Sequence, residues 1–373
     1  MLVVDYITRQ PVPESEWRDL PKVSSSSIGA ELGCNASRVY QYGHRLVALR
    51  TPPHLALGSL IHEALAHVLP FQENAVSVLA CHAAVKISID KLSERTEYAA
   101  TDWESLGAQA LGALLYHVPR MDLDRWETLA VELELGAVLT LEDGRRILLT
   151  GRIDWVARHK PSGVVCLLDH KTSASEALGP HFVEHDAQLV IYRELLKAHG
   201  WDIGVTLHHQ LSSSAPKQPK RNKDGQIAAS KVRSDWETVC NAIQRAGGDP
   251  WSERYQTLRE HCERQVFRRW AQDVTSERAH AAMFAEIQRT AARMTHPVQP
   301  PLTHNRRAWT CGKCFYRAWC DADLQGLDKS SLLGVHYHSD EPPGEWAQVS
   351  GNALQIETER TALLGKYAGG WTP

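Results

Sequence analysis

The stretch GRIDWVARHKPSGVVCLLDHKT, residues 151–172, contains two apolar runs separated by the turn signal Lys160-Pro161-Ser162-Gly163. Valine, leucine, isoleucine and tryptophan dominate both runs, and a run of such residues bounded by turn residues indicates a strand. Asp154 lies within the first run and Asp169 at the end of the second. The stretch therefore predicts two neighbouring antiparallel strands with one carboxylate on each.

The flanking sequence extends this pattern into an α/β fold. Residues 128–141 form another strand-like run, which the turn Glu142-Asp143-Gly144 joins to the first strand as a β-meander. An amphipathic helix is expected over residues 181–200 and a fourth strand over 202–212. Helices are also expected in residues 55–69, 74–118, 234–247 and 252–295, and from near Ile28 through Cys34 after the serine run 24–27. We therefore expect a central mixed sheet flanked by helices, with an N-terminal helical region.

Composition excludes some classes of protein and leaves others open. Apolar residues make up 43 % of the 373 residues and charged residues 23 %, with a net charge of −3, as in an ordinary globular protein. Nucleic-acid binding must then depend on local basic patches. Because the chain has neither a long apolar run nor the basic start of a signal peptide, we expect no membrane contact and a cytoplasmic location.

Asp154, Asp169 and Lys171 are the first candidate catalytic residues. Asp169 and Lys171 are two positions apart and should project from the same face of their strand. Paired carboxylates bind Mg²⁺ or Mn²⁺, and a neighbouring lysine can orient a water molecule or neutralise a phosphate. The alternative is that both aspartates mark strand ends and that Lys171 is a solvated surface charge.

Three further polar residues extend this candidate site. Gln188 and Tyr192 are four residues apart, so a helix places them on one face, where they could bind a phosphate or a water molecule. His62 lies within an apolar helical pattern and could supply a third, imidazole ligand, especially for Mn²⁺. The alternatives are a core tyrosine with a glutamine at its rim, and a core histidine with satisfied hydrogen bonds.

Cysteines mark a second candidate site near the C-terminus. Cys311, Cys314 and Cys320 follow a C-x₂-C-x₅-C spacing, which is typical of metal binding by thiolates. Cys34, His304 or a water molecule could complete the set, and the spacing does not separate zinc from an iron–sulfur cluster. The other cysteines, at positions 81, 166, 240 and 262, are expected to be buried apolar residues.

Together these motifs resemble the PD-(D/E)XK nuclease superfamily in its RecB-type exonuclease branch, over about residues 24–325. The resemblance implies a restriction-endonuclease-like core in which His62, Asp154 and Asp169 bind metal and Lys171 is catalytic. Gln188 and Tyr192 would form the supporting motif. Glu132 best matches an additional family glutamate, although strand alternation also admits Glu134. A subset of the branch binds a [4Fe–4S] cluster through four cysteines, which correspond here to Cys34, Cys311, Cys314 and Cys320.

The residue pattern, together with the resemblance, sets the expected domain organisation. Residues 1–23 would be an N-terminal arm, and residues 24–325 a nuclease domain closed by the cluster. Residues 326–373 would be a peripheral or partly disordered tail. A basic loop over residues 213–233 resembles an insertion in phage-like or prophage-like members. Its candidate DNA-binding residues are Lys217, Lys220, Arg221 and Lys223.

The sequence thus predicts a Mg²⁺- or Mn²⁺-dependent deoxyribonuclease that degrades single-stranded DNA or duplex ends, in recombination, repair or phage DNA metabolism. Because the chain contains no P-loop motif, any helicase or recombination partner would be another chain. One alternative is a catalytically inactive DNA-binding or scaffold protein with the same fold. Another is a zinc-containing nucleic-acid-binding module.

Overall fold

The computed structural model describes residues 1–49, 51–71, 78–98, 101–173, 183, 186–297, 304, 311–312 and 314–339. By their internal contacts these residues divide into two compact units. The first comprises residues 1–28, 52–94 and 101–299, and the second comprises residues 29–51, 95–100 and 300 onward.

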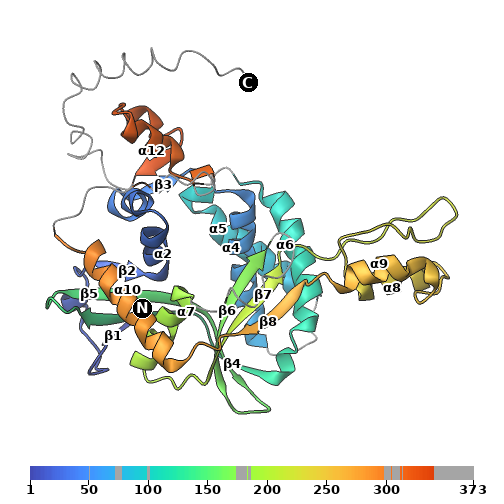
Figure 1. The fold of residues 1–373 in the computed structure, drawn as a ribbon, viewed down its shortest axis with the longest axis horizontal. Coiled ribbons are helices and arrows are strands. Elements are labelled where there is room, and N and C mark those ends of the chain that lie inside the picture. The colour runs from blue at the N-terminus through green and yellow to red at the C-terminus, as the bar shows by residue number, and fades with distance from the viewer. Residues whose placement is uncertain are drawn as a thin grey trace. The chain divides into compact units, whose positions relative to one another are not determined.

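A mixed sheet forms the centre of the first unit (Figure 1). Its path runs β1-β4-β5-β6-β7-β8, and β2 pairs with β5 beside this path. The strands β4, β5 and β6 form the antiparallel meander expected from the sequence, and β6 and β7 are parallel neighbours. The bounds are β1 (Leu2–Asp5), β2 (Lys22–Ser24), β4 (Trp126–Thr140), β5 (Arg146–His159), β6 (Val165–Ser173), β7 (Val205–Ser212) and β8 (Arg268–Gln272).

Helices cover this sheet. Since the parallel strands β6 and β7 need a crossover, α7 (Ala187–Ala198) connects them and packs on β4, β5 and β6. It carries Leu189 and Leu195 into the main core, and α10 (Glu277–Met294) adds Phe284 and Ile287. The helices α4 (Pro53–Val68), α5 (Val78–Ser93) and α6 (Trp103–His117) pack against one another, and α4 also contacts β5 and β6. The remaining helices of this unit are α1 (Glu14–Trp17), α8 (Trp236–Arg245) and α9 (Gln256–Glu263).

The second unit holds α3 (Asn35–Arg38), α12 (Arg317–Leu324) and the short antiparallel pair β3 (Leu46–Ala48) and β9 (Tyr337–Ser339). Helix α2 (Ser25–Gly33) starts in the first unit and ends in the second. The core of the second unit is a small aromatic cluster that includes Tyr40, Tyr316, Trp319 and Tyr337.

Three expectations from the sequence need correction. The N-terminal arm is wrong in part, because β1 and β2 pair in parallel with β4 and β5, and the buried Val3, Val4 and Val23 anchor them. Residues 252–295 are not helical throughout, because β8 pairs with β7 inside this range. Cys34 does not lie on a helix; it is the residue between α2 and α3.

Two other expectations from the sequence need only a small correction. Residues 74–118 contain two helices, α5 and α6, rather than one continuous helix. Within the expected tail, β9 pairs with β3, whereas residues 340–373 lie outside the described part of the chain. Across the described residues, no helix combines the length and the apolar character needed to cross a membrane.

Gly151 tests the packing of α7 on the sheet. A Cβ atom at this position would lie 2.7 Å from Leu195 Cδ1 and 2.9 Å from the ring of Tyr192. We expect Gly151→Ala to lower the free energy of unfolding by about 1–3 kcal/mol, measured by urea denaturation, because overpacking forces α7 away from β5. Gly29→Ala is the control, since its Cβ would meet nothing within 4 Å. Equal stability of the two variants would contradict this account.

Candidate functional site

The candidate active site forms where one edge of β5 changes partner. This edge pairs with β2 over residues 148–150 and with β6 over residues 155–158. The motif Gly151-Arg152-Ile153-Asp154 occupies the interval between these two ladders. On this edge the backbone of Asp154 belongs to neither ladder. Its side-chain carboxylate accepts a hydrogen bond of 2.8 Å from the backbone N–H of His170 on β6. The change of partner thus places a carboxylate beside the end of β6.

Asp169, Lys171, Gln188 and Tyr192 lie together in one contact network. Lys171 Nζ lies 2.7 Å from Asp169 Oδ2 and donates to Gln188 Oε1 at 2.7 Å. The Gln188 Nε2 amide lies 2.9 Å from both Asp169 Oδ1 and the Tyr192 hydroxyl. The amide of Gln188 therefore joins the lysine of β6 to its aspartate and to the tyrosine one turn along α7.

His62 reaches this site from α4. Its Nδ1 atom lies 3.4 Å from Asp154 Oδ2, and its ring packs edge-on against His170. Gly58, one turn earlier on α4, allows this approach, because a Cβ there would lie only 2.9 Å from Thr172 Oγ1 on β6. The close contact between α4 and β6 therefore brings His62 to the carboxylates.

The two aspartates differ in their electrostatic environments. Burial opposes the charge of Asp154, but the nearby His62 imidazole and the hydrogen bonds to His62 and His170 lower its pKa to about 2. Burial, followed by the negative charge of Asp154, raises the pKa of Asp169 to about 6 although Lys171 opposes the shift. Two buried carboxylates that repel each other are a donor set that a divalent cation would stabilise.

Lys171 stays protonated in this setting. Burial favours the neutral amine, but the carboxylates of Asp169 and Asp186 outweigh it and raise the lysine pKa above its ordinary value. Burial and the two aspartate charges likewise raise the pKa of Tyr192. At neutral pH the site therefore presents an ammonium and a phenol hydroxyl rather than their conjugate bases.

Glu132 and Glu134 are distinguished by the backbone of β4. Glu132 has a left-handed φ of 49°, and its half-buried carboxylate forms an ion pair with Arg152. Burial raises its pKa, and the negative charge of Asp154 acts in the same direction. Glu134 is exposed. The two glutamates therefore differ in environment although strand alternation predicts one face, and Glu132 is the one beside Asp154.

Sequence reasoning missed Asp186 and His208. Asp186 caps α7 by accepting a 2.8 Å hydrogen bond from Gln188 N, and its other oxygen lies 3.0 Å from His208 Nε2. His208 is buried on β7 beside Asp169, and Asp186 also lies 3.9 Å from Lys171 Nζ. An N-cap signal just before the Gln188 motif was present in the sequence, but the contact with β7 depends on tertiary structure.

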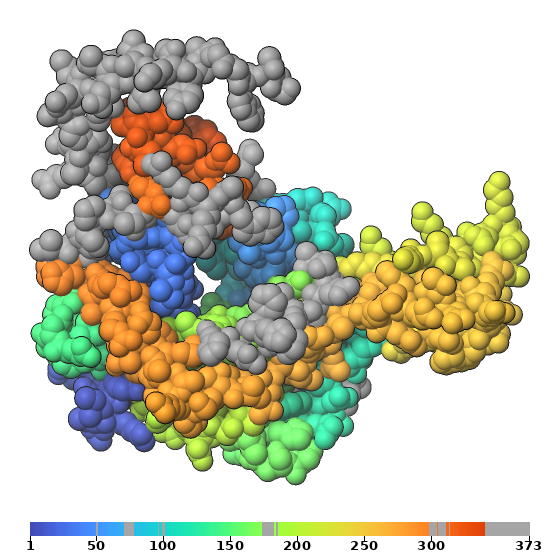
Figure 2. All heavy atoms as spheres, viewed as in Figure 1, coloured from blue at the N-terminus to red at the C-terminus, as the bar shows by residue number. Residues whose placement is uncertain are grey.

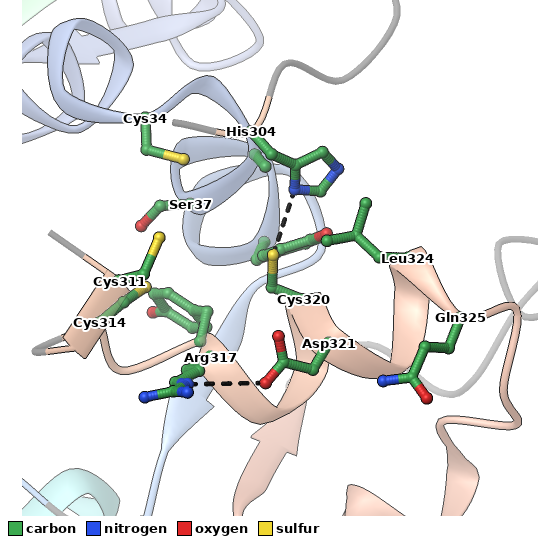
Figure 3. Close-up of a pocket in the computed structure, with 13 residues that line it drawn as sticks. Cys34, Ser37, His304, Cys311, Cys314, Arg317, Cys320, Asp321, Leu324 and Gln325 are labelled. Atoms are coloured by element: carbon green, nitrogen blue, oxygen red, sulfur yellow. Dashed lines mark hydrogen bonds and ion pairs between the residues drawn. The ribbon is translucent and has the colours of Figure 1, made fainter. Parts of the chain in front are cut away.

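The cysteines line one cavity in the second unit (Figure 3). Cys34, Cys311, Cys314 and Cys320 surround a space of about 430 Å³. His304, the other candidate ligand, also lines it, with Nδ1 3.1 Å from Cys320 Sγ. Burial, and then the charge of Asp321 and of the other three thiols, raises the pKa of Cys320 to about 11. A bound cation would remove this penalty, so the donor set fits a thiolate-bound metal group.

No three histidine, cysteine, aspartate or glutamate side chains converge tightly enough to hold a single metal ion in the parts of the chain that the structure describes. The predicted ligands are therefore neighbours rather than preformed coordination spheres. The four predicted DNA-binding residues, Lys217, Lys220, Arg221 and Lys223, are all exposed in the loop between β7 and α8.

Comparison with known proteins agrees with this geometry. Residues 22–321 match the PD-(D/E)XK nuclease superfamily. The chain is also 30 % identical over 129 residues to one subunit of the ATP-dependent helicase/deoxyribonuclease of Streptococcus pneumoniae, in strains Hungary19A-6 and R6. The same identity holds for the exonuclease/helicase subunit RexB of serotype 4 strain TIGR4. Each of these matches covers 30 % of this chain but only 11 % of the relative.

Asp186→Ala tests how much the cap of α7 and the hydrogen bond between Asp186 and His208 stabilise the protein. We expect it to lower the free energy of unfolding by about 2–4 kcal/mol, because it removes a helix cap and the carboxylate that is hydrogen-bonded to buried His208 at 3.0 Å. Ser276→Ala, which removes only the cap of α10, should cost about 1 kcal/mol. Urea denaturation measures both, and Asp186→Asn should restore the cap. A loss for Asp186→Ala no larger than that for Ser276→Ala would show that the contact with His208 contributes nothing.

Proposed function

Because the chain belongs to the PD-(D/E)XK nuclease superfamily, we propose that it is a Mg²⁺- or Mn²⁺-dependent deoxyribonuclease that degrades DNA from an end. The observation that carries this proposal is the contact network of Asp169, Lys171 and Gln188 beside Asp154 and His62. The names of the pneumococcal relatives, which include a deoxyribonuclease and an exonuclease, support DNA as substrate and attack from an end.

The proposed metal ligands are Asp154, Asp169 and His62, with Glu132 as an additional carboxylate. A divalent cation at this position supplies Lewis acidity to the scissile phosphate and acidifies a water molecule. Asp169 would have to be ionised to bind the cation; burial and the charge of Asp154 raise its pKa, and a bound cation would lower it again.

Lys171 and the residues that position it are proposed to act on the attacking water and the phosphate. Lys171 is an ammonium with a raised pKa, so its proposed role is to orient the attacking water and to neutralise charge on the phosphate rather than to remove a proton. Gln188 fixes Lys171 through a 2.7 Å hydrogen bond to its Oε1. Tyr192 anchors the amide of Gln188 in turn, at 2.9 Å. Asp186, 3.9 Å from Lys171 Nζ, favours the charged amine from the other side.

We further propose a [4Fe–4S] cluster bound by Cys34, Cys311, Cys314 and Cys320. The cavity that these thiols line, about 430 Å³, has room for a cluster, and the resemblance to the four-cysteine branch favours a cluster over the zinc alternative. Because such a group would link Cys34 to Cys311 across a long stretch of sequence, it would restrict the unfolded chain as a crosslink does. This link is the proposed closure of a nuclease domain over residues 24–325.

The exposed basic residues Lys217, Lys220, Arg221 and Lys223 are proposed to bind the DNA backbone. A helicase or recombination protein is the proposed partner, since the names of the relatives combine a helicase with a nuclease. A cytoplasmic location, a phage-like origin, and a role in recombination, repair or phage DNA metabolism remain predictions from the sequence.

Cleavage of end-labelled single- and double-stranded DNA tests the nuclease. With Mg²⁺ or Mn²⁺ we expect degradation, and we expect Asp169→Ala and Lys171→Ala each to slow it by about 10²-fold or more. The exposed ion pair of Lys86 and Asp90 on α5 provides matched controls, and Asp90→Ala and Lys86→Ala should change the rate less than about twofold. Closed circular DNA should resist the enzyme if attack starts from an end.

Two results would overturn the proposal. Absence of cleavage by cluster-loaded protein with both metals and both substrates would favour the inactive DNA-binding or scaffold protein. Equal activity of wild type and Asp169→Ala would mean that the catalytic residues lie elsewhere.

Iron and sulfide analysis of protein purified without oxygen tests the cluster. We expect a brown protein with about four iron and four sulfide per chain, and loss of iron in Cys34→Ser. Cys240→Ser, which changes a half-buried cysteine of α8, should retain the iron. A colourless protein that contains zinc would support the zinc-containing binding module instead.

A further inference from the structure

A self-contained insertion separates β7 from β8. These strands are antiparallel neighbours, which a turn of a few residues could join. Instead the chain forms the basic loop, α8 and α9, which Figure 2 shows as a lobe extending from the first unit. Ile227, Val239, Ile243 and Leu258 are completely or almost completely buried in a hydrophobic cluster of this lobe. The insertion therefore has its own core and does not serve to close the sheet.

Trp251 is a solvent-exposed tryptophan of the insertion. Trp251 is 64 % exposed although the cluster of apolar side chains lies close by in sequence. The guanidinium group of Arg259 lies 5.3 Å from its ring centroid, and the edge of Trp236 packs against it at 6.2 Å. Its backbone N–H donates to the Asp249 carboxylate at 3.0 Å. The ring is therefore held in place by a cation and a second aromatic ring while much of its surface stays open.

The insertion that carries this ring has a net positive charge. Residues 214–265 contain ten lysines and arginines against seven aspartates and glutamates, whereas the whole chain has a net charge of −3. Arg254 hydrogen-bonds to Gln226 of the basic loop, and the Tyr255 hydroxyl donates to the backbone oxygen of Ile227 at 3.2 Å. These hydrogen bonds connect the segment after Trp251 to the loop that carries the exposed lysines.

We propose that Trp251 is a stacking platform for an unpaired base, and that the insertion binds single-stranded DNA. An indole that is largely exposed and has a guanidinium group over its ring suits a base joined to a phosphate backbone, because the ring can stack on any base and the cation can neutralise a phosphate. A base within a duplex cannot reach such a ring without unstacking. This inference rests on the proposed nuclease function for its substrate and narrows that substrate to DNA with a single-stranded segment.

Fluorescence anisotropy of labelled oligo(dT) tests the platform. The 373-residue protein carries Asp169→Ala, which is expected to slow cleavage, and is compared with and without Trp251→Ala. We expect Trp251→Ala to weaken binding by about tenfold or more and Trp251→Phe, which keeps an aromatic face, to retain most of it. Leu79→Ala changes an apolar residue on α5 that is 78 % exposed and should have no effect. Binding of a blunt duplex should change less than about twofold in Trp251→Ala.

Salt dependence separates stacking from phosphate contacts. Arg221→Ala should reduce the magnitude of the slope of log K against log salt by about 0.7, the value for one phosphate contact on a single strand. Trp251→Ala should weaken binding without changing this slope. A reduced slope in Trp251→Ala would mean that the ring only positions the cations, and would overturn the stacking role.

The two proposals can fail separately. If the wild-type protein cleaves DNA but Trp251→Ala binds oligo(dT) as tightly as its parent, the platform is wrong and the nuclease stands. The lobe would then be a candidate surface for a protein partner. If no variant cleaves DNA but Trp251→Ala still loses oligo(dT) binding, the platform stands and the nuclease is wrong.

Discussion

The exchange of partners along β5 is the constraint on which the candidate active site depends. One edge of this strand pairs with β2 and then with β6, and the motif from Gly151 to Asp154 lies between them. Asp154 can therefore turn its carboxylate to the backbone N–H of His170. Gly151 leaves room for α7 at the same point, which brings Gln188 and Tyr192 to Asp169. The placement of the Asp154 carboxylate and the packing of α7 therefore both occur where β5 changes its pairing partner from β2 to β6.

Burial of like charges gives this site its chemical character. Asp154 and Asp169 repel each other in a setting from which water is largely excluded, and Asp169 responds with a pKa raised to about 6. Lys171 offsets part of the repulsion, and Gln188 holds that lysine in place. The protein keeps these groups together because α7, β6 and α4 are each fixed by packing. Such an arrangement stores electrostatic free energy that a divalent cation can release on binding.

The same principle applies to the cysteines, although their unit is separate. Four thiols line one cavity, and their proximity and burial raise the pKa of Cys320. An aromatic cluster with Tyr40 and Trp319, not the thiols themselves, forms the core that positions them. The insertion with Trp251 shows the reverse arrangement, in which a core supports an apolar ring that stays in solvent. In each place packing against a hydrophobic core holds the polar or exposed group in position.

The amino-acid sequence was sufficient to predict the meander β4-β5-β6, the helix α7 and the pairing of Asp169 with Lys171, because these follow from local periodicity and short spacing. It favoured Cys34 over His304 beside the other three cysteines only through resemblance to a family. Packing between distant segments was needed to show that residues 2–5 and 268–272 join the sheet, since a short strand is stable only against its partner. The contact of Asp186 with His208 and the exposure of Trp251 likewise emerged only in the folded chain. Those features depend on residues distant in sequence, and no local pattern encodes the distance between them.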